Sequence, residues 1–330
     1  MFEPLGTPLF LADARKNGKG QSPVREILIF FVLTMIAQLA QGFLMMPYQL
    51  IYMLTDKGFF EVAALGDMDA ALEYSAALTL KMTEEPWYWV FMLLSTAAVI
   101  FAVWIYCRKI QGRSYLSLGL TRRPYKEYAI GLFWGLLAFG AALGFSLAFG
   151  SLSYAGISDN ANLFFALALL LGYVVQGFSE EILCRGYLMV ALGRSMPLWM
   201  AVVSSAFAFA ALHMGNAGYT LLGFLNVFLF GVLMSLYMIR RGSIWGAAAL
   251  HTAWNFAEGV LTDSFVSGMK MPVSILSFLL KEGDELIHGG AFGAEGGIAV
   301  TCVLAVGIVL LLMMKSKNAA LPEIPKKEEK

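Results

Sequence analysis

Long apolar segments recur along almost the whole 330-residue chain and constrain its fold more than any other feature. A run of about 17 to 25 apolar residues can cross a bilayer as a helix. About eight such segments are present, at approximately 26–50, 87–107, 128–150, 162–190, 197–214, 219–239, 243–262 and 296–314. Because 59% of the residues are hydrophobic and only 14% are charged, we predict an all-α, polytopic membrane helix bundle that has the lipid bilayer as a partner.

The lysines and arginines give the predicted bundle an orientation. If the N-terminus is inside, all but four of the 23 basic residues fall in the inner connections, and the exceptions are Lys57, Lys81, Lys270 and Lys281. Cytoplasmic loops carry the excess of Lys and Arg. We therefore predict a multi-pass protein of the cell membrane with both termini cytoplasmic. The net charge is zero and no long basic block occurs, which excludes nucleic acid as an expected partner.

Two predicted outer loops are long enough to have structure of their own. The first, at about 55–85, is acidic and rich in alanine, which is compatible with a short surface helix. The second, at about 263–295, contains MPVSILSFLL, which is too short to span and is expected to be interfacial or re-entrant. The C-terminal segment LPEIPKKEEK is expected to be a disordered, solvated tail.

Ionisable residues inside apolar segments are costly at membrane depth, so they mark candidate functional sites. The fourth segment carries Glu180, Glu181 and Arg185. Glu181 and Arg185 are four residues apart with the acid first, the favourable order for an ion pair along a helix. Glu180 lies about 100° away around the helix, so it is the better candidate for a general base. A charged pair that only ends a helix at the cytoplasmic interface would explain Glu181 and Arg185, but not Glu180.

Two of the three histidines lie in other apolar segments, each one turn from a second candidate side chain. His213 follows Phe209 by four residues, and His251 precedes Asn255 by four. Residues i and i+4 share one face of a helix. The structural alternatives are a histidine that hydrogen-bonds at a helix end and a polar pair that joins transmembrane helices. At 1.5 Å per residue, Glu180, His213 and Asn255 fall within about 10 Å of one another in depth, so they can meet.

This set of side chains suits amide hydrolysis. The reaction needs a base for water, donors for the developing oxyanion and an acid for the leaving amine. Glu180 and His213 can supply the base and the acid, and the Asn255 carboxamide can donate to the oxyanion. Zinc is an alternative, because Glu180, His213 and His251 would match a three-ligand catalytic site with an open position. The chain has no HExxH motif, and no other cofactor is indicated.

Three short motifs resemble those of the CAAX-protease and bacteriocin-processing (CPBP, or Abi) family of intramembrane proteases. EEILCR resembles the EExxxR motif, FAALH resembles FxxxH, and HTAWN resembles HxxxN. They occur in the order of the family, on separate apolar segments, within residues 162–262. The segment GGAFGAEGG also resembles a glycine-rich segment that many bacterial members have before their last helix, whereas residues 1–120 resemble no family that we can name.

The resemblance implies a multi-helix membrane fold in which a peptide bond is hydrolysed in a cavity reached from the cytoplasm. By motif position, the implied roles are water activation for Glu180 and His213, oxyanion stabilisation for His251 and Asn255, and support for Glu181, Arg185 and Phe209. The implied substrate is a membrane-associated peptide or a lipidated protein. Eukaryotic members of the family cleave prenylated CAAX proteins, whereas bacterial members are linked to peptide processing and bacteriocin immunity.

These expectations divide the chain into an N-terminal cytoplasmic segment, N-terminal transmembrane helices with the acidic loop, a CPBP-like catalytic core, and an outer loop with the last helix and tail. The corresponding ranges are 1–25, 26–160, 161–262 and 263–330. Two other functions stay open: a non-catalytic adaptor or bacteriocin-immunity protein, and a proton-coupled transporter, although no inverted repeat supports the transporter. His288, in the second outer loop, is expected to be a surface or loop-closing residue.

Overall fold

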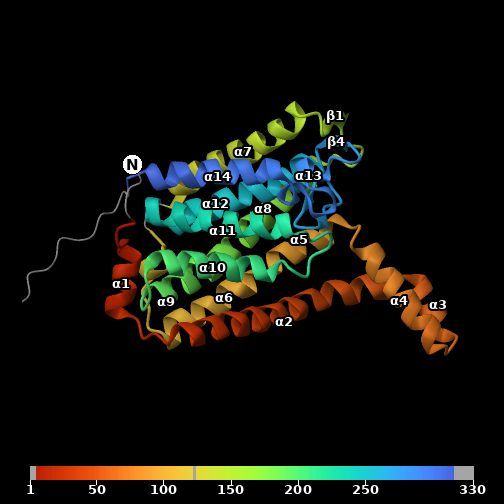
Figure 1. Cartoon of the computed structure of the whole chain (residues 1–330). Helices are drawn as coiled ribbons and strands as arrows, with labels where there is room; N and C mark the ends of the chain where they lie inside the picture. The colour runs from red at the N-terminus through yellow and green to blue at the C-terminus, as the bar shows by residue number, and fades with distance from the viewer. Residues whose placement is uncertain (1–4, 122–123, 316–330) are drawn as a thin grey trace, which may run out of the picture.

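The computed structural model describes residues 5–121 and 124–315, and these form a bundle of long helices that run side by side (Figure 1). Five helices have the length and apolar composition of a membrane span: Pro23–Thr55, Pro86–Ile110, Pro124–Ala148, Leu163–Gly193 and Leu221–Arg241. This confirms the prediction of a helical membrane bundle. Two shorter apolar helices, α10 (Leu198–Leu212) and α14 (Ile298–Met313), together with α12 (Ile244–Phe256), occupy the other three predicted positions. The number of helices that cross the membrane stays a prediction.

Two helices that carry candidate motifs change their hydrogen-bond pattern near their ends, as the Pro86–Ile110 helix also does. The 163–193 helix consists of α8 (Leu163–Glu181), a π-helical stretch η3 (Ile182–Met189) and α9 (Val190–Gly193). Similarly, α12 continues as a π-helical turn, η4 (Ala257–Leu261). Such π segments inside α-helices are rare and are frequent at functional sites. Both occur next to the candidate motifs, so local helix geometry already points to this part of the bundle.

Local sequence fixes where the site-bearing helices begin. Asn162 caps α8 by accepting a hydrogen bond from Phe165 N, at 3.2 Å. Thr220 caps α11 (Leu221–Arg241) in the same way through Gly223 N, at 2.9 Å. Gly242 ends α11 with a φ of +70°, a left-handed conformation that glycine adopts without strain, and α12 begins two residues later. These signals hold α11 and α12 as a tight antiparallel pair.

Helix α12 lies in the middle of the bundle, packed against α7 (Pro124–Ala148), α8 and α11. All but two of its residues are buried. Close packing against α7 depends on small residues, because a Cβ on Gly135 would stand 2.5 Å from the carbonyl oxygen of Leu250. The helix that carries His251 and Asn255 is therefore rigidly held and shielded from lipid.

Two small antiparallel sheets, which were not predicted, lie in the connections of the helical bundle. Strand β1 (Leu152–Ile157) pairs with β4 (Leu276–Leu280), and β2 (Phe265–Val266) pairs with β3 (Met269–Lys270). The segment expected to be interfacial or re-entrant thus forms a strand. The alternating, aromatic and branched sequence of SILSFLL suits a two-stranded ribbon, and its partner lies more than 100 residues earlier in the chain.

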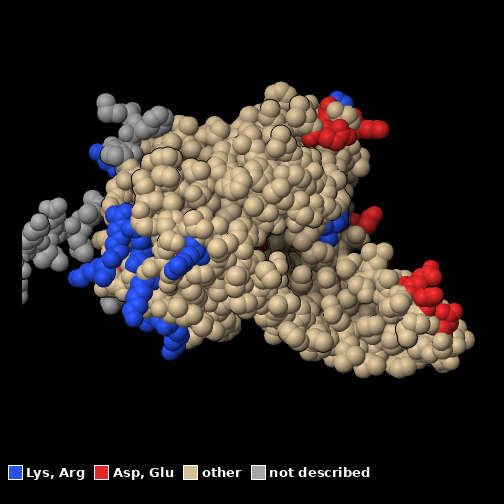
Figure 2. Space-filling view, turned by 60° about the horizontal axis from the view of Figure 1, so that its bottom comes forward, with Lys and Arg blue, Asp and Glu red and all other residues tan. Residues whose placement is uncertain are grey.

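The acidic first loop forms two helices rather than one, α3 (Lys57–Ala64) and α4 (Met68–Met82), which project from the bundle (Figure 1). Helix α1 (Leu9–Asn17) and the C-terminal end of α14 lie together at the other end. Most of the visible Lys and Arg side chains gather at that second end, and the visible Asp and Glu side chains gather at the opposite end, some near α3 and α4 and others in a separate patch on the bundle (Figure 2). The predicted disordered tail, 321–330, lies outside the described residues.

The remaining elements are short. Two precede α7, a π-helical turn η1 (Tyr106–Ile110) after α5 (Pro86–Ser95) and α6 (Ala97–Ile105), and a 3₁₀ turn η2 (Leu116–Leu118). Three more follow β4: α13 (Glu285–His288), η5 (Gly290–Phe292) and η6 (Ala294–Gly296). The last three bring the second outer loop back onto the end of the bundle before α14 begins.

Candidate active site

A fully buried ion pair stands at the junction of α8 and η3. Glu181 Oε1 lies 2.9 Å from Arg185 Nη1, and neither side chain is exposed. The predicted contact therefore forms, although the intervening helix is π-helical. A buried charge pair costs several kcal/mol of desolvation per ion unless further partners satisfy it, so its other contacts matter.

His251 of α12 provides one of those contacts and joins the two adjacent glutamates. Its Nδ1 lies 2.9 Å from Glu181 Oε1, and because a carboxylate accepts hydrogen bonds, Nδ1 is the donor. Its Nε2 lies 3.6 Å from Glu180 Oε2. The histidine is thereby oriented by one carboxylate while its second nitrogen faces the other.

Gln176, which the sequence analysis did not single out, joins Glu180 to Asn255. Its Nε2 donates to Glu180 Oε1 at 2.6 Å, and its Oε1 accepts from Asn255 Nδ2 at 3.1 Å. Gln176 precedes Glu180 by one helical turn, so the i, i+4 spacing was the available signal. Gln176 thus holds Oε1 of Glu180, whereas Oε2 has no hydrogen bond to Gln176 and lies toward His251.

His213 reaches the same region from the end of α10. Its Nδ1 donates to the carbonyl oxygen of Phe209, at 2.9 Å, which leaves Nε2 available. The Phe209 ring lies 4.7 Å from the His213 ring, centroid to centroid, and the Arg185 guanidinium lies 4.7 Å from the same phenyl centroid. Phe209 therefore separates the arginine from the histidine and contacts both.

Together these side chains line one small pocket of about 30 Å³. A cavity of about 10–15 Å³ already holds one water molecule. Within the described part of the chain, Glu180 Oε2 accepts no hydrogen bond, although the atom is buried. The structure brings the four predicted catalytic residues together with others from α8, α11, the β2–β3 hairpin and η6: Gln176, Glu180, Phe209, His213, Val227, Phe230, His251, Asn255, Val266, Ser267, Met269 and Glu295.

The second outer loop contributes part of this lining, which the sequence analysis missed. Ser267 and Met269 come from the β2–β3 hairpin, and Glu295 comes from η6. Ser267 follows Asn255 by 12 positions, Glu295 follows it by 40, and no helical spacing links these residues to the motifs. The glycine-rich context of Glu295 was the one available signal.

The donor set does not support a zinc site. Within residues 5–121 and 124–315, no group of three or more His, Cys, Asp and Glu side chains is arranged to hold a metal ion. His251 already directs one ring nitrogen to Glu181, and the buried Oε2 of Glu180 faces its other nitrogen. No step of the hydrolysis that these residues could perform therefore requires zinc.

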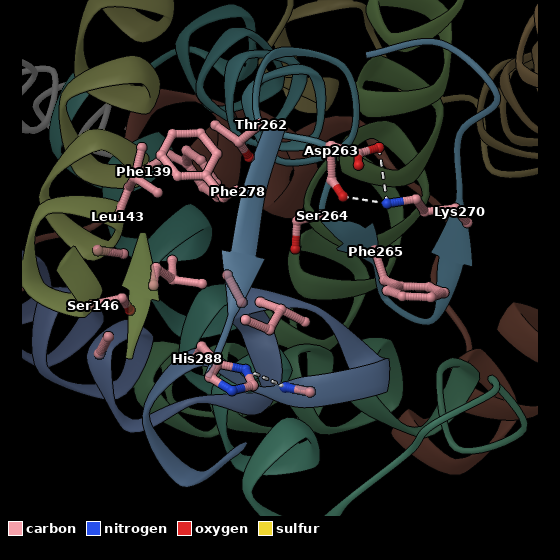
Figure 3. A pocket seen from close by; sticks show the side chains of 16 residues that line it. Phe139, Leu143, Ser146, Thr262, Asp263, Ser264, Phe265, Lys270, Phe278 and His288 are labelled. Carbon is pink, nitrogen blue, oxygen red and sulfur yellow. Dashed lines mark hydrogen bonds and ion pairs between the residues drawn. The ribbon is translucent and has the colours of Figure 1, made fainter. Parts of the chain in front are cut away.

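His288 lies apart from the site, beside another cavity of about 110 Å³ (Figure 3). It is 6% exposed, so the expectation of a surface residue is wrong. Its Nε2 donates to the carbonyl oxygen of Lys281 and its Nδ1 accepts from Gly290 N, both at 3.1 Å. These bonds close the loop, which is the second role expected for this residue. The cavity also adjoins the Asp263–Lys270 ion pair, at 2.8 Å.

Comparison with known proteins found a family similarity over part of the chain. Residues 162–257 match the family model of the type II CAAX prenyl endopeptidase Rce1-like proteins. All three motifs lie inside the matched segment, so the resemblance to the CAAX protease family is confirmed. At family level, the match indicates a membrane protease of the CAAX type. A search of curated proteins found no match.

Proposed function

We propose that this protein is an intramembrane endopeptidase that hydrolyses a peptide bond of a membrane-associated peptide or lipidated protein. One observation supports the proposal most directly. A buried oxygen of Glu180 that accepts no hydrogen bond from the described residues borders a water-sized pocket, which is also lined by His213, His251 and Asn255. A base, imidazoles and a carboxamide around one bound water are the groups that amide hydrolysis requires.

In the first step, Glu180 Oε2 accepts a proton from the bound water, and the water oxygen forms a bond to the carbonyl carbon of the substrate. Gln176 holds Oε1 at 2.6 Å, so the carboxylate keeps Oε2 directed at the pocket. The carbonyl oxygen becomes an oxyanion as its π bond to carbon breaks. Fixing a base within hydrogen-bond reach of water is worth about 10²- to 10⁴-fold in rate.

The oxyanion would be stabilised by Asn255 and His251. One hydrogen of Asn255 Nδ2 bonds to Gln176, and the second is available to the substrate. His251 can donate through Nε2 when it is an imidazolium, and the Glu181 carboxylate at 2.9 Å from its Nδ1 stabilises that form. Donors fixed in place before the reaction cost no reorganisation in the transition state.

The leaving amine would receive its proton from His213. With Nδ1 bonded to the Phe209 carbonyl, the Nε2–H of the His213 imidazolium transfers its proton to the amide nitrogen as the C–N bond breaks. Glu180 then returns the proton taken from water to His213. One water is consumed, an acid and an amine are released, and both side chains recover their starting protonation.

We further propose eight crossings with both termini in the cytoplasm of a cell-membrane protein. The separation of basic and acidic side chains to opposite ends supports this orientation (Figure 2). In that orientation, the β2–β3 hairpin and η6 belong to the outer loop and cover the pocket on the outer side. Access from the cytoplasm, which the family resemblance implies, agrees with this arrangement.

The test uses the full chain reconstituted in lipid vesicles with an internally quenched, farnesylated peptide that ends in a CAAX sequence. Glu180→Gln is expected to reduce cleavage about 10²- to 10⁴-fold while expression and thermal unfolding stay normal. Glu282→Gln, an exposed glutamate of the outer loop, is the matched control and should cleave normally.

Undiminished cleavage by Glu180→Gln would contradict the proposal. Comparing N-termini in membranes that contain the wild type or Glu180→Gln would identify natural substrates. Loss of proton-linked uptake in Glu180→Gln would instead favour the transporter, and a partner-binding phenotype that survives the substitution would favour the adaptor. Metal analysis of the purified protein tests the zinc alternative separately.

A further inference from the structure

Glu295 is a carboxylate of the pocket that no motif includes. It lies in η6, directly before α14 and outside the matched segment 162–257. The residue is 8% exposed, and it lines the same pocket as Glu180 and His213. A buried acid in a membrane protein is costly, so its position calls for a physical reason.

The backbone around Glu295 is held by neighbouring helices without help from its side chain. Glu258, in the π-helical end of α12, accepts from Glu295 N at 3.4 Å. Asn226 of α11 donates to the carbonyl oxygens of Glu295 and Gly297, at 2.7 and 2.9 Å, and accepts from Thr301 at 2.7 Å. The turn is thus anchored through its main chain, and the carboxylate is not required to form it.

The side chain has one hydrogen bond, from Ser267 Oγ to its Oε2. Ser267 occupies the tip of the β2–β3 hairpin with a φ of +47°, a strained conformation for a residue other than glycine. Asn216, in the loop after α10, holds the same tip by donating to the Ser267 carbonyl, at 2.9 Å. Strain of this kind persists where the surroundings enforce it, and it concentrates at functional sites.

The charged groups around Glu295 are those of the proposed mechanism. Burial raises the pKa of this carboxyl, and the Ser267 hydrogen bond and the charges of His213 and His251 lower it, whereas Glu180 raises it. Glu295, His213 and His251 line the same pocket of about 30 Å³, so their charges can interact across it. Of the two, His251 already has Glu181 as a hydrogen-bonded carboxylate, while among the described residues the ring of His213 hydrogen-bonds only to the Phe209 carbonyl.

We propose that Glu295 is a positioning residue for His213, supplied to the catalytic pocket by the loop before the last helix. This inference rests on the proposed function. The carboxylate faces the imidazole across the pocket, favours its charged form and directs Nε2 toward the leaving amine. Glu295 thus acts on His213 through its charge across the pocket, whereas Glu181 acts on His251 through a direct hydrogen bond. The site is complete only when residues beyond 257 are folded onto the core.

Glutamine separates this role from a structural one. Glu295→Gln keeps an oxygen that can accept from Ser267, so it preserves the anchor of the hairpin and removes the charge. In the quenched-peptide assay, it is expected to lower kcat roughly 10- to 100-fold with KM within about twofold. Glu295→Asp should recover part of the loss, and Glu282→Gln should match the wild type.

The same assay distinguishes failure of this inference from failure of the proposed function. If Glu180→Gln is inactive and Glu295→Gln has the wild-type kcat, the positioning role is overturned and the peptidase proposal stands. If Glu180→Gln cleaves normally, the peptidase proposal itself fails. A purely structural Glu295 would lower the amount or stability of folded protein without changing kcat per folded molecule.

A second measurement does not require turnover. Thermal unfolding in detergent of Glu295→Gln, His213→Asn and the double variant forms a double-mutant cycle. An interaction between the two side chains predicts that the shifts in Tm are not additive, with Glu295→Gln having a different effect once the imidazole is absent. Additive shifts would overturn the inference whatever the substrate proves to be.

Discussion

Two buried polar clusters in this bundle differ in how completely their atoms are hydrogen-bonded. The Glu26 cluster, at the end of the bundle near α1, consists of Glu26, Tyr106, Gln111, Arg113 and Tyr187. The Glu180 cluster, in the pocket, consists of Gln176, Glu180, Glu181, Arg185 and His251. Each contains a fully buried acid and a fully buried arginine, so burial alone does not separate them.

The Glu26 cluster is saturated. Glu26 Oε1 accepts from Gln111 Nε2 and Gln21 N, both at 2.9 Å, and Oε2 accepts from Tyr187 at 2.9 Å and Tyr106 at 3.4 Å. Arg113 donates from all three nitrogens, including bonds of 2.7 Å to the carbonyl oxygens of Ser117 and Gly186. A network with every group satisfied rigidifies the structure and has no capacity left for a substrate.

The Glu180 cluster is not saturated. Within the described residues, one carboxylate oxygen of Glu180, one of Glu181, and Nε and Nη2 of Arg185 have no hydrogen bond. Buried polar atoms without a hydrogen bond lower the stability of the folded state unless water or a ligand supplies the missing partner. The comparison indicates that buried charge supports the fold where it is saturated, and supports chemistry where it borders a cavity with unused hydrogen-bonding capacity.

The largest effect on stability is expected from Arg113→Ala. The substitution would remove the hydrogen bonds that the charged Arg113 donates to the carbonyl oxygens of Ser117, Gly186 and Tyr187, at about 1.5–3 kcal/mol each. The free energy of unfolding, measured by denaturant titration in detergent, should fall by about 3 kcal/mol or more. The activity per folded molecule should stay within a factor of about two, because Arg113 lies outside the pocket.

Lys109→Ala is the control, since Lys109 is an exposed basic residue of the same segment. It should change the free energy of unfolding by less than about 0.5 kcal/mol. If Arg113→Ala instead abolished activity in fully folded protein, the Glu26 cluster would be coupled to the site, and the division between the two clusters would be wrong.

Matched glutamate-to-glutamine substitutions should have effects of opposite sign on stability. Glu26→Gln replaces an oxygen that accepts two hydrogen bonds with a donor, so it should destabilise by about 1–3 kcal/mol. Glu180→Gln removes charge from a buried oxygen that accepts no hydrogen bond, so it should be neutral or stabilising by up to about 1 kcal/mol. Thermal unfolding of both variants, side by side, tests the difference. Equal destabilisation would show that both clusters support the fold alike.

Helical periodicity made the Glu180 cluster partly predictable from the sequence. Glu181 and Arg185, and likewise His251 and Asn255, share a helix face because they are four residues apart, and that relation survives in the structure. Positions of the apolar segments were predictable for the same local reason. Gln176 and Glu180 have the same i, i+4 spacing, but Gln176 is uncharged, so a search for ionisable residues inside apolar segments does not find it.

The rest of the site depends on contacts between distant segments, and a single sequence carries little information about them. Glu295 reaches the pocket because Glu258 and Asn226 hold its turn, across 37 and 69 positions of chain. Ser267 meets it across 28 positions. The pairing of β1 with β4 is similarly non-local, so the strand at 276–280 could not be predicted from local sequence.

Gln176→Leu should give an intermediate effect and sharpen the comparison inside the pocket. Without Gln176, Glu180 loses the hydrogen bond that fixes its Oε1, and Asn255 loses its acceptor. The loss of one hydrogen bond to a charged group corresponds to roughly a tenfold lower kcat. Gln38→Leu, at an exposed position of α2 (Pro23–Thr55), is the control. A wild-type kcat for Gln176→Leu would mean that Glu180 is positioned by other contacts.

The smallest effect is expected at a partly exposed polar pair, Asp56 and Tyr74, which joins α3 to α4 outside the bundle. Tyr74 Oη donates to Asp56 Oδ1 at 2.8 Å, and Phe59 N donates to the same oxygen at 2.9 Å. The hydrogen bond from Tyr74, followed by that from Phe59, lowers the pKa of Asp56 below its usual value. A carboxyl whose pKa is lowered by folding stabilises the folded form above its unfolded pKa, and the contribution is lost as the pH falls through the folded value.

Amide hydrogen exchange of α3 measures this contribution. Protection factors in wild-type protein should be steady near neutral pH and should begin to decrease below about pH 4, the ordinary pKa of an aspartate, because the folded pKa of Asp56 is lower. Tyr74→Phe should lower the protection of α3 slightly at neutral pH and shift its loss to a higher pH, while the protection of α8 and α12 is unchanged. A partly exposed pair is screened by water and therefore contributes little, in contrast to either buried cluster. If Tyr74→Phe changed protection in α8, the projecting helices would be coupled to the catalytic pocket, and exposure would not be a sufficient guide to which polar contacts the bundle depends on.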